Sequence, residues 1–156
     1  QDSYAKPAVR LEGHNHFVSS TCFSSDATHL LTSSWDKTAR IWNIDQRSTT
    51  TLLRGHQKDV LAIAISPDNR RIFTASRDKT VRVWTIRGEC KQQIQGDSWA
   101  TSLAVTTDPD NQDGVLFAIG YWDGTVKVGS IDNELKIIFT EKNAHNGRVH
   151  SVTFNE

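Results

Sequence analysis

Hydrophobic and polar residues alternate in short runs along most of the chain, and this period of two is the pattern of β-strands rather than of helices. Between residues 60 and 94 it predicts four strands, at 60–65, 71–75, 81–85 and 90–94. The first, VLAIAI, is apolar on both faces and should be the innermost, while the later strands become progressively more polar. The intervening SPDN, SRDKT and IRGE contain typical turn residues, so the stretch predicts an antiparallel four-stranded sheet.

The strand pattern recurs with a fixed period. The sequence TSSWDKTARIW at 32–42 returns as TASRDKTVRVW at 74–84, 42 positions later, and a Gly-His pair at 13–14 returns at 55–56. In both copies the His precedes an Asp by 22 positions, and that Asp precedes a Trp by 6. A third copy contains YWDGTVKVG, and a fourth begins at AHNGRVHSVTF. Such repetition predicts a fold built from stacked copies of one unit.

The third copy departs from the other two at three positions. Ile119 stands in place of the Thr, Gly129 stands in place of the Trp, and Asp97 follows a Gly where a His would be expected. We therefore expect this copy to lack the polar network of the other two, with the apolar segment VLFAIG (115–120) compensating by burial. The stretch TTDPDNQDG (106–114) is expected to be a lengthened loop.

Four antiparallel strands per ~40–45 residues, opened by Gly-His and with a Trp in the third strand, resemble the blade of the WD-repeat family. The resemblance implies an all-β fold, a partial WD-repeat β-propeller of about three and a half four-stranded antiparallel blades. The expected parts of this one domain are the last strand of a preceding blade (1–12), three blades (13–54, 55–95 and 96–140) and the first strand of a further blade (141–156). Seven blades at this period would need roughly 294 residues. Because an open arc exposes apolar blade flanks, we expect an internal piece of a longer propeller, or the ordered part of one.

The residues shared by the first two copies have a structural and a chemical interpretation. In WD-repeat blades a His, a Thr, an Asp and a Trp form a hydrogen-bonded tetrad, and the resemblance assigns this role to His14, Thr32, Asp36 and Trp42 and to His56, Thr74, Asp78 and Trp84. A His, a hydroxyl and an Asp also make up a nucleophilic triad, but an active site is normally built once, whereas this set occurs twice at identical spacing. We therefore predict no catalytic residue. We also predict no metal site and no cofactor, because the blade period separates the histidines and Cys22 and Cys90 lack CxxC spacing.

The sequences of individual segments within the blades indicate a narrower resemblance. LEGHNHFVSS, SSWDKTARIWNI, the stretch from RGHQKDVLAIAISPDNRRI to SRDKTVRVWTIRGECK, and GYWDGTVKV are together similar to the family of the receptor for activated protein kinase C, a WD-repeat scaffold of the small ribosomal subunit. This resemblance runs from about residue 11 to residue 154. It implies a non-enzymatic, cytoplasmic scaffold without a small-molecule substrate. Its implied partners are ribosomal proteins and ribosomal RNA of the small subunit, together with protein kinases or other signalling proteins. The alternative is a G-protein-β-like or other signalling WD-repeat adaptor that does not bind ribosomes.

The residue before the turn Asp in each copy is expected to point to the rim of the propeller, where partners dock. These residues are Trp35, Arg77 and Trp122, and the next residues after the Asp in two copies are Lys37 and Lys79. Trp and Arg carry much of the binding energy at protein interfaces. Simple exposure on a turn would also explain them.

Composition restricts these alternatives. The chain has 18 Lys and Arg against 18 Asp and Glu, so a contact with nucleic acid depends on a local patch. Candidate contacts to ribosomal RNA, carried over from the family by position only, are Lys6, Arg10 and Lys37, although Glu12 places an acid near them. The hydrophobic (37%) and charged (23%) fractions are those of a soluble globular protein. No apolar run approaches the ~20 residues of a membrane span, and the start QDSYAKPAVR has no signal-peptide pattern, so the expected compartment is the cytosol.

Overall fold

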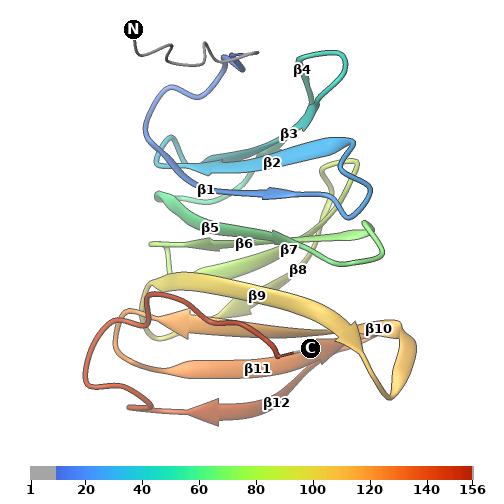
Figure 1. Cartoon of the computed structure of the whole chain (residues 1–156). Coiled ribbons are helices and arrows are strands. Elements are labelled where there is room, and N and C mark those ends of the chain that lie inside the picture. Colours follow the sequence, from blue (N-terminus) through green and yellow to red (C-terminus); the bar gives the residue numbers. More distant parts are fainter. Residues whose placement is uncertain (1–9, 156) are drawn as a thin grey trace, which may run out of the picture.

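The computed structural model of the 156-residue chain describes residues 10–155, which form three four-stranded antiparallel sheets (Figure 1). The first sheet contains β1 (Val18–Phe23), β2 (His29–Ser34), β3 (Thr38–Asn43) and β4 (Ser48–Arg54). The second contains β5 (Val60–Ile65), β6 (Arg71–Ser76), β7 (Thr80–Thr85) and β8 (Cys90–Gln95). The third contains β9 (Ala100–Asp108), β10 (Asn111–Tyr121), β11 (Val126–Ile131) and β12 (Leu135–Glu141). Within each sheet the strands pair in chain order, as in propeller blades, and the predicted all-β class is confirmed. In the part of the chain that the structure describes, no helix is long and apolar enough to cross a membrane.

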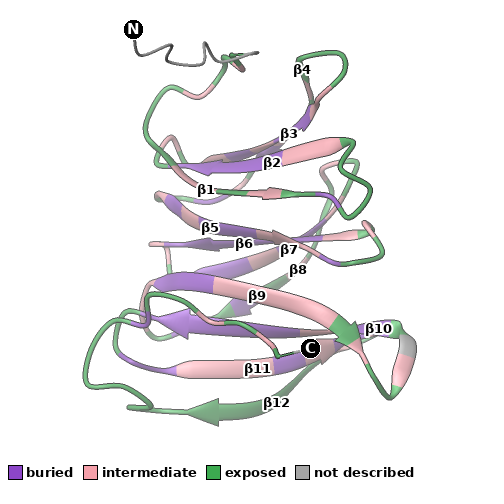
Figure 2. Cartoon of the chain, in the orientation of Figure 1, coloured by how far each residue is buried: buried purple, intermediate pink, exposed green. Residues whose placement is uncertain are grey.

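The second sheet follows the alternation of its sequence closely. Its strands begin and end within one residue of the predicted bounds, and β5 contacts β1 of the first sheet and β9 of the third. The most buried strand, however, is β6 and not β5: five of its six residues are buried (Figure 2). Side chains of β6 pack against a neighbouring sheet on each face, while β5 forms an edge of its own sheet. β5 therefore has the expected place beside the first strand of each neighbouring sheet, while burial is greatest in the next strand.

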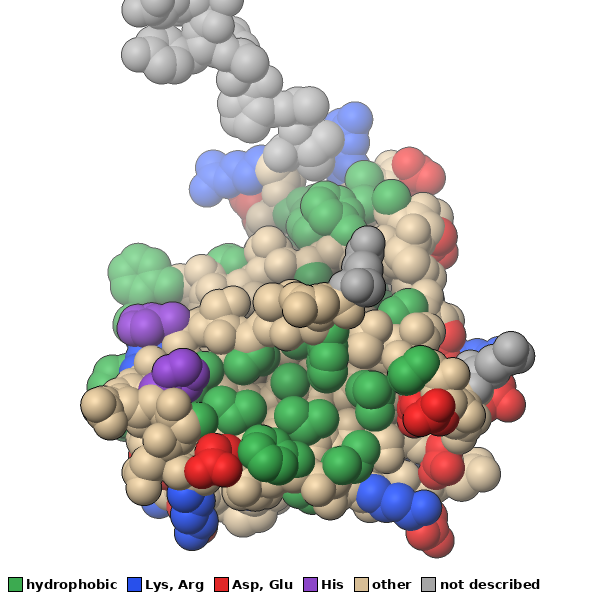
Figure 3. Space-filling model, turned by 60° about the horizontal axis from the view of Figure 1, so that its bottom comes forward, with side chains coloured by type: hydrophobic (Ala, Val, Ile, Leu, Met, Phe, Trp, Pro, Cys, Tyr) green, Lys and Arg blue, Asp and Glu red, His purple; other side chains and the backbone are tan. Residues whose placement is uncertain are grey.

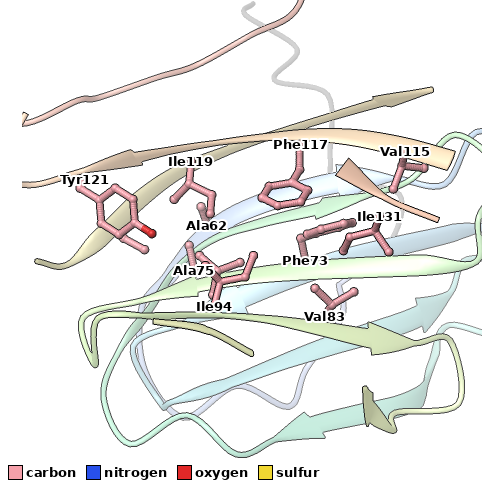
Figure 4. Packing of buried hydrophobic residues seen from close by; sticks show 12 residues of the cluster. Ala62, Phe73, Ala75, Val83, Ile94, Val115, Phe117, Ile119, Tyr121 and Ile131 are labelled. Carbon is pink, nitrogen blue, oxygen red and sulfur yellow. The ribbon is translucent and has the colours of Figure 1, made fainter. Parts of the chain in front are cut away.

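Two layers of hydrophobic side chains join the three sheets. The layer between the first and second sheets consists of the buried residues Leu31, Ala39, Ile41, Leu53, Ile63, Ile72 and Trp84. The layer between the second and third sheets is centred on Phe73 and Phe117, whose ring centroids are 5.6 Å apart (Figure 4). Burial of each large side chain contributes roughly 1.5–3 kcal/mol. Packing between neighbouring sheets therefore stabilises the stack, as in other repeat folds.

Both outer sheets of the stack expose large apolar side chains. On the last sheet Ile138 and Phe139 are 62% and 49% exposed, and Figure 3 shows hydrophobic side chains gathered over this end of the molecule. On the first sheet Phe23 is 62% exposed. Inside the stack, apolar sheet faces are covered by the adjoining sheet. Both outer faces thus have the character of blade flanks that lack a neighbour among residues 10–155.

Both ends of the described chain differ from the strands expected there. Residues 10–12 form no strand, and the preceding part of that expected strand lies outside the described residues. The segment 149–154 is likewise without a strand. Val149 donates its N–H to the carbonyl of Tyr121 (3.0 Å) and accepts a hydrogen bond from Thr101 Oγ1 (2.7 Å). A strand needs a continuous ladder to a neighbour, and these two bonds hold only one residue.

The expected loop at 106–114 is wrong in detail, because most of it forms a hairpin. Strand β9 extends to Asp108 and β10 begins at Asn111. The pairs Val115 with Thr107 and Leu116 with Thr106 continue the ladder beyond the length of the other sheets. The β-branched Thr side chains suit an extended backbone, so the inserted residues lengthen two strands and leave a short turn.

Candidate interaction surface

In the first sheet the recurring polar residues form one chain of hydrogen bonds. Trp42 Nε1 donates to Thr32 Oγ1 (2.9 Å), and His14 Nε2 lies 2.7 Å from the same hydroxyl oxygen. The other ring nitrogen, Nδ1, lies 2.7 Å from Asp36 Oδ2. Because a carboxylate can only accept, Nδ1–H donates to Asp36, and the Thr32 hydroxyl then donates to Nε2. The chain connects β2, β3, the turn between them and the segment before β1.

The second sheet repeats this arrangement. His56 Nδ1 lies 2.8 Å from Asp78 Oδ2, His56 Nε2 lies 2.7 Å from Thr74 Oγ1, and Trp84 Nε1 donates to that oxygen at 2.8 Å. Thr74 is fully buried, and Trp84 and His56 are buried beside it. The hydroxyl is therefore engaged on both sides and closed to solvent. A nucleophilic triad needs a hydroxyl that substrate can reach, and this hydroxyl cannot be reached.

The two turn aspartates are ionised. Burial, the largest influence, acts to raise the pKa of Asp36, but hydrogen bonds from Thr38, from His14 and from backbone N–H groups outweigh it and lower the pKa to about 2. Burial, again the largest influence, acts to raise the pKa of Asp78. The hydrogen bonds from its His and Thr partners and from the backbone outweigh it and hold the pKa well below its usual range. Both carboxylates thus remain charged acceptors at neutral pH.

The turn that carries each Asp has the same backbone shape in all three sheets. The residue after the Asp has a positive φ: 69° at Lys37, 70° at Lys79 and 84° at Gly124. In the third turn Asp123 Oδ1 accepts the backbone N–H of Thr125 at 3.0 Å, as the other two aspartates do from the Thr at the same place. The turn is therefore kept even where the tetrad is absent.

Aromatic rings fill the third sheet where the His and Trp are missing. Register places Phe117 directly opposite Gly129, and a Cβ atom at Gly129 would collide with the Phe117 ring. In the same way a Cβ atom at Gly96 would collide with the ring of Tyr121. Phe117, Ile119 and Tyr121 are all essentially fully buried. This sheet is held by apolar packing in place of the polar network.

One backbone hydrogen bond positions the three predicted rim residues. In each sheet the N–H of the residue before the turn Asp donates to the carbonyl of a residue that leads into the first strand, at 2.9–3.0 Å: Trp35 to Phe17, Arg77 to Asp59 and Trp122 to Trp99. The three pairs consequently lie at the same edge of the stack, where β1, β5 and β9 begin, on the left in Figure 1.

A groove of about 460 Å³ lies at this edge, and we call it the rim groove. It is lined by Phe17, Val18, Ser19, Trp35, Leu61, Arg77, Trp99, Trp122 and Arg148. The structure thus brings Trp35, Arg77 and Trp122 together. Sequence reasoning missed Phe17, Trp99 and Arg148. No residue-type signal could have found Phe17 and Trp99, because position 17 recurs at 59 as an Asp and position 99 falls outside the 42-residue spacing.

The predicted lysines and RNA contacts lie elsewhere. Lys37 and Lys79 are exposed, and neither lines the rim groove; Lys37 faces a separate recess that Arg54 also lines. Arg10 pairs with Glu12 (3.2 Å) on an exposed segment beside the first sheet, and Lys6 lies outside the described residues. Arg10 and Lys37 therefore line different recesses of the described structure.

Of the two free thiols, that of Cys22 is half-buried and that of Cys90 is exposed. Between residues 10 and 155, no group of three or more His, Cys, Asp or Glu side chains is placed to hold a metal ion. Burial raises the pKa of the Cys22 thiol to about 11, against a smaller lowering by the backbone at Ile65. This thiol therefore stays protonated and unreactive at neutral pH.

Comparison with known proteins agrees with the repeat. The family model described as "WD domain, G-beta repeat" matches residues 5–43, 46–85 and 88–128, which together are more than half of the chain. Curated relatives match over shorter stretches. The chain is similar to the cross-pathway control WD-repeat protein 2 of Flammulina velutipes, with 50% identity over 50 residues (32% of this chain, 16% of that protein).

Two further relatives carry a ribosomal name. The small ribosomal subunit protein RACK1 of Caenorhabditis elegans is 49% identical over 45 residues (29% of this chain, 14% of that protein). The protein of the same name from Neurospora crassa is 45% identical over 49 residues (31% and 16%). Each match thus covers about a third of this chain and about a sixth of the relative.

Proposed function

Since the chain belongs to the WD-repeat family, we propose that it acts as a non-enzymatic scaffold of the small ribosomal subunit and links signalling proteins to translation. Its partners are then ribosomal proteins, ribosomal RNA and protein kinases or other signalling proteins, and its place of action is the cytoplasm. The ribosomal part of the proposal is supported by the relatives named small ribosomal subunit protein RACK1.

The observation that carries the scaffold role is the opposite orientation of neighbouring side chains in one turn. Asp78 points inward to His56 of the buried tetrad, while Arg77 points outward into the rim groove. The polar side chains of the tetrad thus form hydrogen bonds that hold strands together. The exposed groups differ from blade to blade, and Trp and Arg are the residue types that carry much of the binding energy at protein interfaces.

Cosedimentation tests the ribosomal role. The chain is mixed with purified small ribosomal subunits and centrifuged through sucrose at increasing salt. We expect it to migrate with the subunits at low salt and to dissociate as salt rises, because phosphate contacts release counterions. A Lys37→Gln variant should reduce the slope of log K against log salt by about 1. The matched control is Lys91→Gln. Lys91 is an exposed residue of β8, the outermost strand of its sheet, and it pairs with Glu89. A chain that stays at the top of the gradient at every salt concentration contradicts the proposal.

The alternative is a signalling WD-repeat adaptor that works away from ribosomes. It is favoured by the similarity to the cross-pathway control protein and by the equal numbers of basic and acidic residues. Failure to cosediment, together with retained binding of a signalling partner, would select this alternative.

A further inference from the structure

We propose that the rim groove binds an extended peptide segment in which an acidic residue adjoins a large apolar one. This inference rests on the proposed scaffold function, and it specifies the chemistry of the partner at that surface. It is carried by the charges that line the groove, by the way its indole rings are already stacked, and by its exposed apolar end.

The charge of the groove is positive although the chain is neutral. Its charged lining residues are Arg77 and Arg148, and no carboxylate lines it. Arg77 is partly committed, because its Nη1 lies 2.7 Å from Asp59 Oδ2 and its side chain is 37% exposed. Arg148 is exposed, and none of the described carboxylates forms an ion pair with it. An acidic side chain in the groove would complement these two guanidinium groups.

The indole rings favour a carboxylate at their edges. The guanidinium of Arg77 lies 4.2 Å from the Trp99 ring centroid, and that of Arg148 lies 5.3 Å from the Trp122 centroid. The two indoles are 5.0 Å apart and tilted by 50°. A guanidinium thus approaches each indole ring, although Trp122 remains 46% exposed. The ring edges carry the positive side of the quadrupole, so an anion that approaches them is attracted by ring and guanidinium together.

The other end of the groove is apolar. Phe17 and Trp35 pack edge to face with centroids 5.4 Å apart, and they remain 69% and 41% exposed. Val18 beside them is 52% exposed. An exposed cluster of this kind indicates a contact surface for an apolar side chain. Since this cluster adjoins the arginine and indole end within one groove, one short segment can fill both ends.

The same geometry disfavours single-stranded nucleic acid. Proteins that bind it offer free aromatic faces on which bases stack. In the rim groove Arg77 covers a face of Trp99, and His16 and Phe17 pack around Trp35 at 5.6 and 5.4 Å.

Tryptophan fluorescence of the chain provides the test. Of its five tryptophans, Trp35, Trp99 and Trp122 line the groove, while the other two are buried in the tetrads. The chain is titrated with the terminally blocked peptide Ser-Glu-Phe-Glu-Ser, and with Ser-Gln-Phe-Gln-Ser, Ser-Glu-Ser-Glu-Ser and oligouridylate. We expect saturable binding of the first peptide, weaker by at least about threefold when either the two acids or the Phe is replaced. Equal affinity for the Gln peptide overturns the inference, and so does tighter binding of oligouridylate.

Two variants locate the binding. Arg148→Gln should weaken the binding of the acidic peptide by about two- to fivefold, whereas its affinity for the Gln peptide should differ little from that of the parent chain. The matched control, Arg87→Gln, changes an exposed arginine that does not line the groove and should bind as the parent does. Unchanged binding by Arg148→Gln overturns the assignment to this groove. Peptide binding requires no ribosome. If the chain binds the peptide but fails to cosediment, the inference stands and the ribosomal role is refuted. If the chain cosediments but does not bind the peptide, the ribosomal role stands and the inference is refuted.

Discussion

Replacing Thr74 by Val removes one hydroxyl and preserves the shape of the side chain. That hydroxyl accepts from Trp84 Nε1 at 2.8 Å and lies 2.7 Å from His56 Nε2. All three side chains are buried, so water cannot take its place. A buried donor or acceptor that loses its partner costs about 1–3 kcal/mol. Because Thr74→Val creates one orphan of each kind, we expect the free energy of unfolding to fall by roughly 2–6 kcal/mol.

Urea unfolding followed by circular dichroism measures this loss, with Thr107→Val at an exposed position of β9 as the matched control, expected within about 0.5 kcal/mol of the parent. Trp84→Phe removes the indole donor, so the double variant Thr74→Val with Trp84→Phe leaves only the His56 acceptor without a partner. The double variant should lose less than the sum of the single losses, by about 1–2 kcal/mol. Additive losses, or a Thr74→Val variant as stable as the parent, would refute the idea that the tetrad acts as a unit.

Three further predictions use other parts of the molecule. Folding lowers the pKa values of Asp36 and Asp78, so their hydrogen bonds stabilise the fold above the ordinary carboxyl pKa and are lost as the carboxylates bind protons below it. The urea midpoint should therefore fall as the pH is lowered from about 5 to about 2, and Asp78→Asn should reduce this pH dependence. Gly129→Ala places a Cβ against the Phe117 ring and 2.6 Å from the Lys136 carbonyl, so it should lower the free energy of unfolding by about 1–3 kcal/mol, whereas Gly147→Ala, which meets nothing within 4 Å, should not. The apolar outer faces should make the chain associate as its concentration rises, and analytical ultracentrifugation of Phe139→Lys should show less association than the parent.

The features that the sequence predicted well are those in which residue type repeats with position. Alternation of apolar and polar residues places the four strands of the second sheet within one residue, because each strand buries side chains on a fixed period. The His, Thr, Asp and Trp side chains meet in two sheets because strand pairing brings the same four positions together each time. Local chemistry and repeat spacing suffice in such cases.

The rim groove shows where that reasoning stops. Trp35, Arg77 and Trp122 could be placed at the rim from their positions before the turn Asp. Their neighbours Phe17 and Trp99 could not be placed there, because a backbone hydrogen bond fixes that position in each sheet and any side chain can occupy it. Arg148 approaches the groove from a segment with no strand of its own, and only the folded chain brings it to the Trp122 ring. Recognition surfaces are assembled from the positions that a repeat leaves variable.

The third sheet also explains why all partners of a tetrad can be lost together, whereas the loss of one partner alone is costly. The His, Thr and Trp partners are all absent there, so none of them is left buried without its mate. Apolar rings occupy the same space, since Phe117 fills the region beside Gly129. A cost remains, because the hydroxyls of Tyr121 and Ser102 are buried without a hydrogen-bond partner among the described residues. Each such orphan costs about 1–3 kcal/mol and is outweighed where several large side chains are buried, whereas a tetrad that kept its Trp and His but lost its Thr would carry two orphans and gain no new packing.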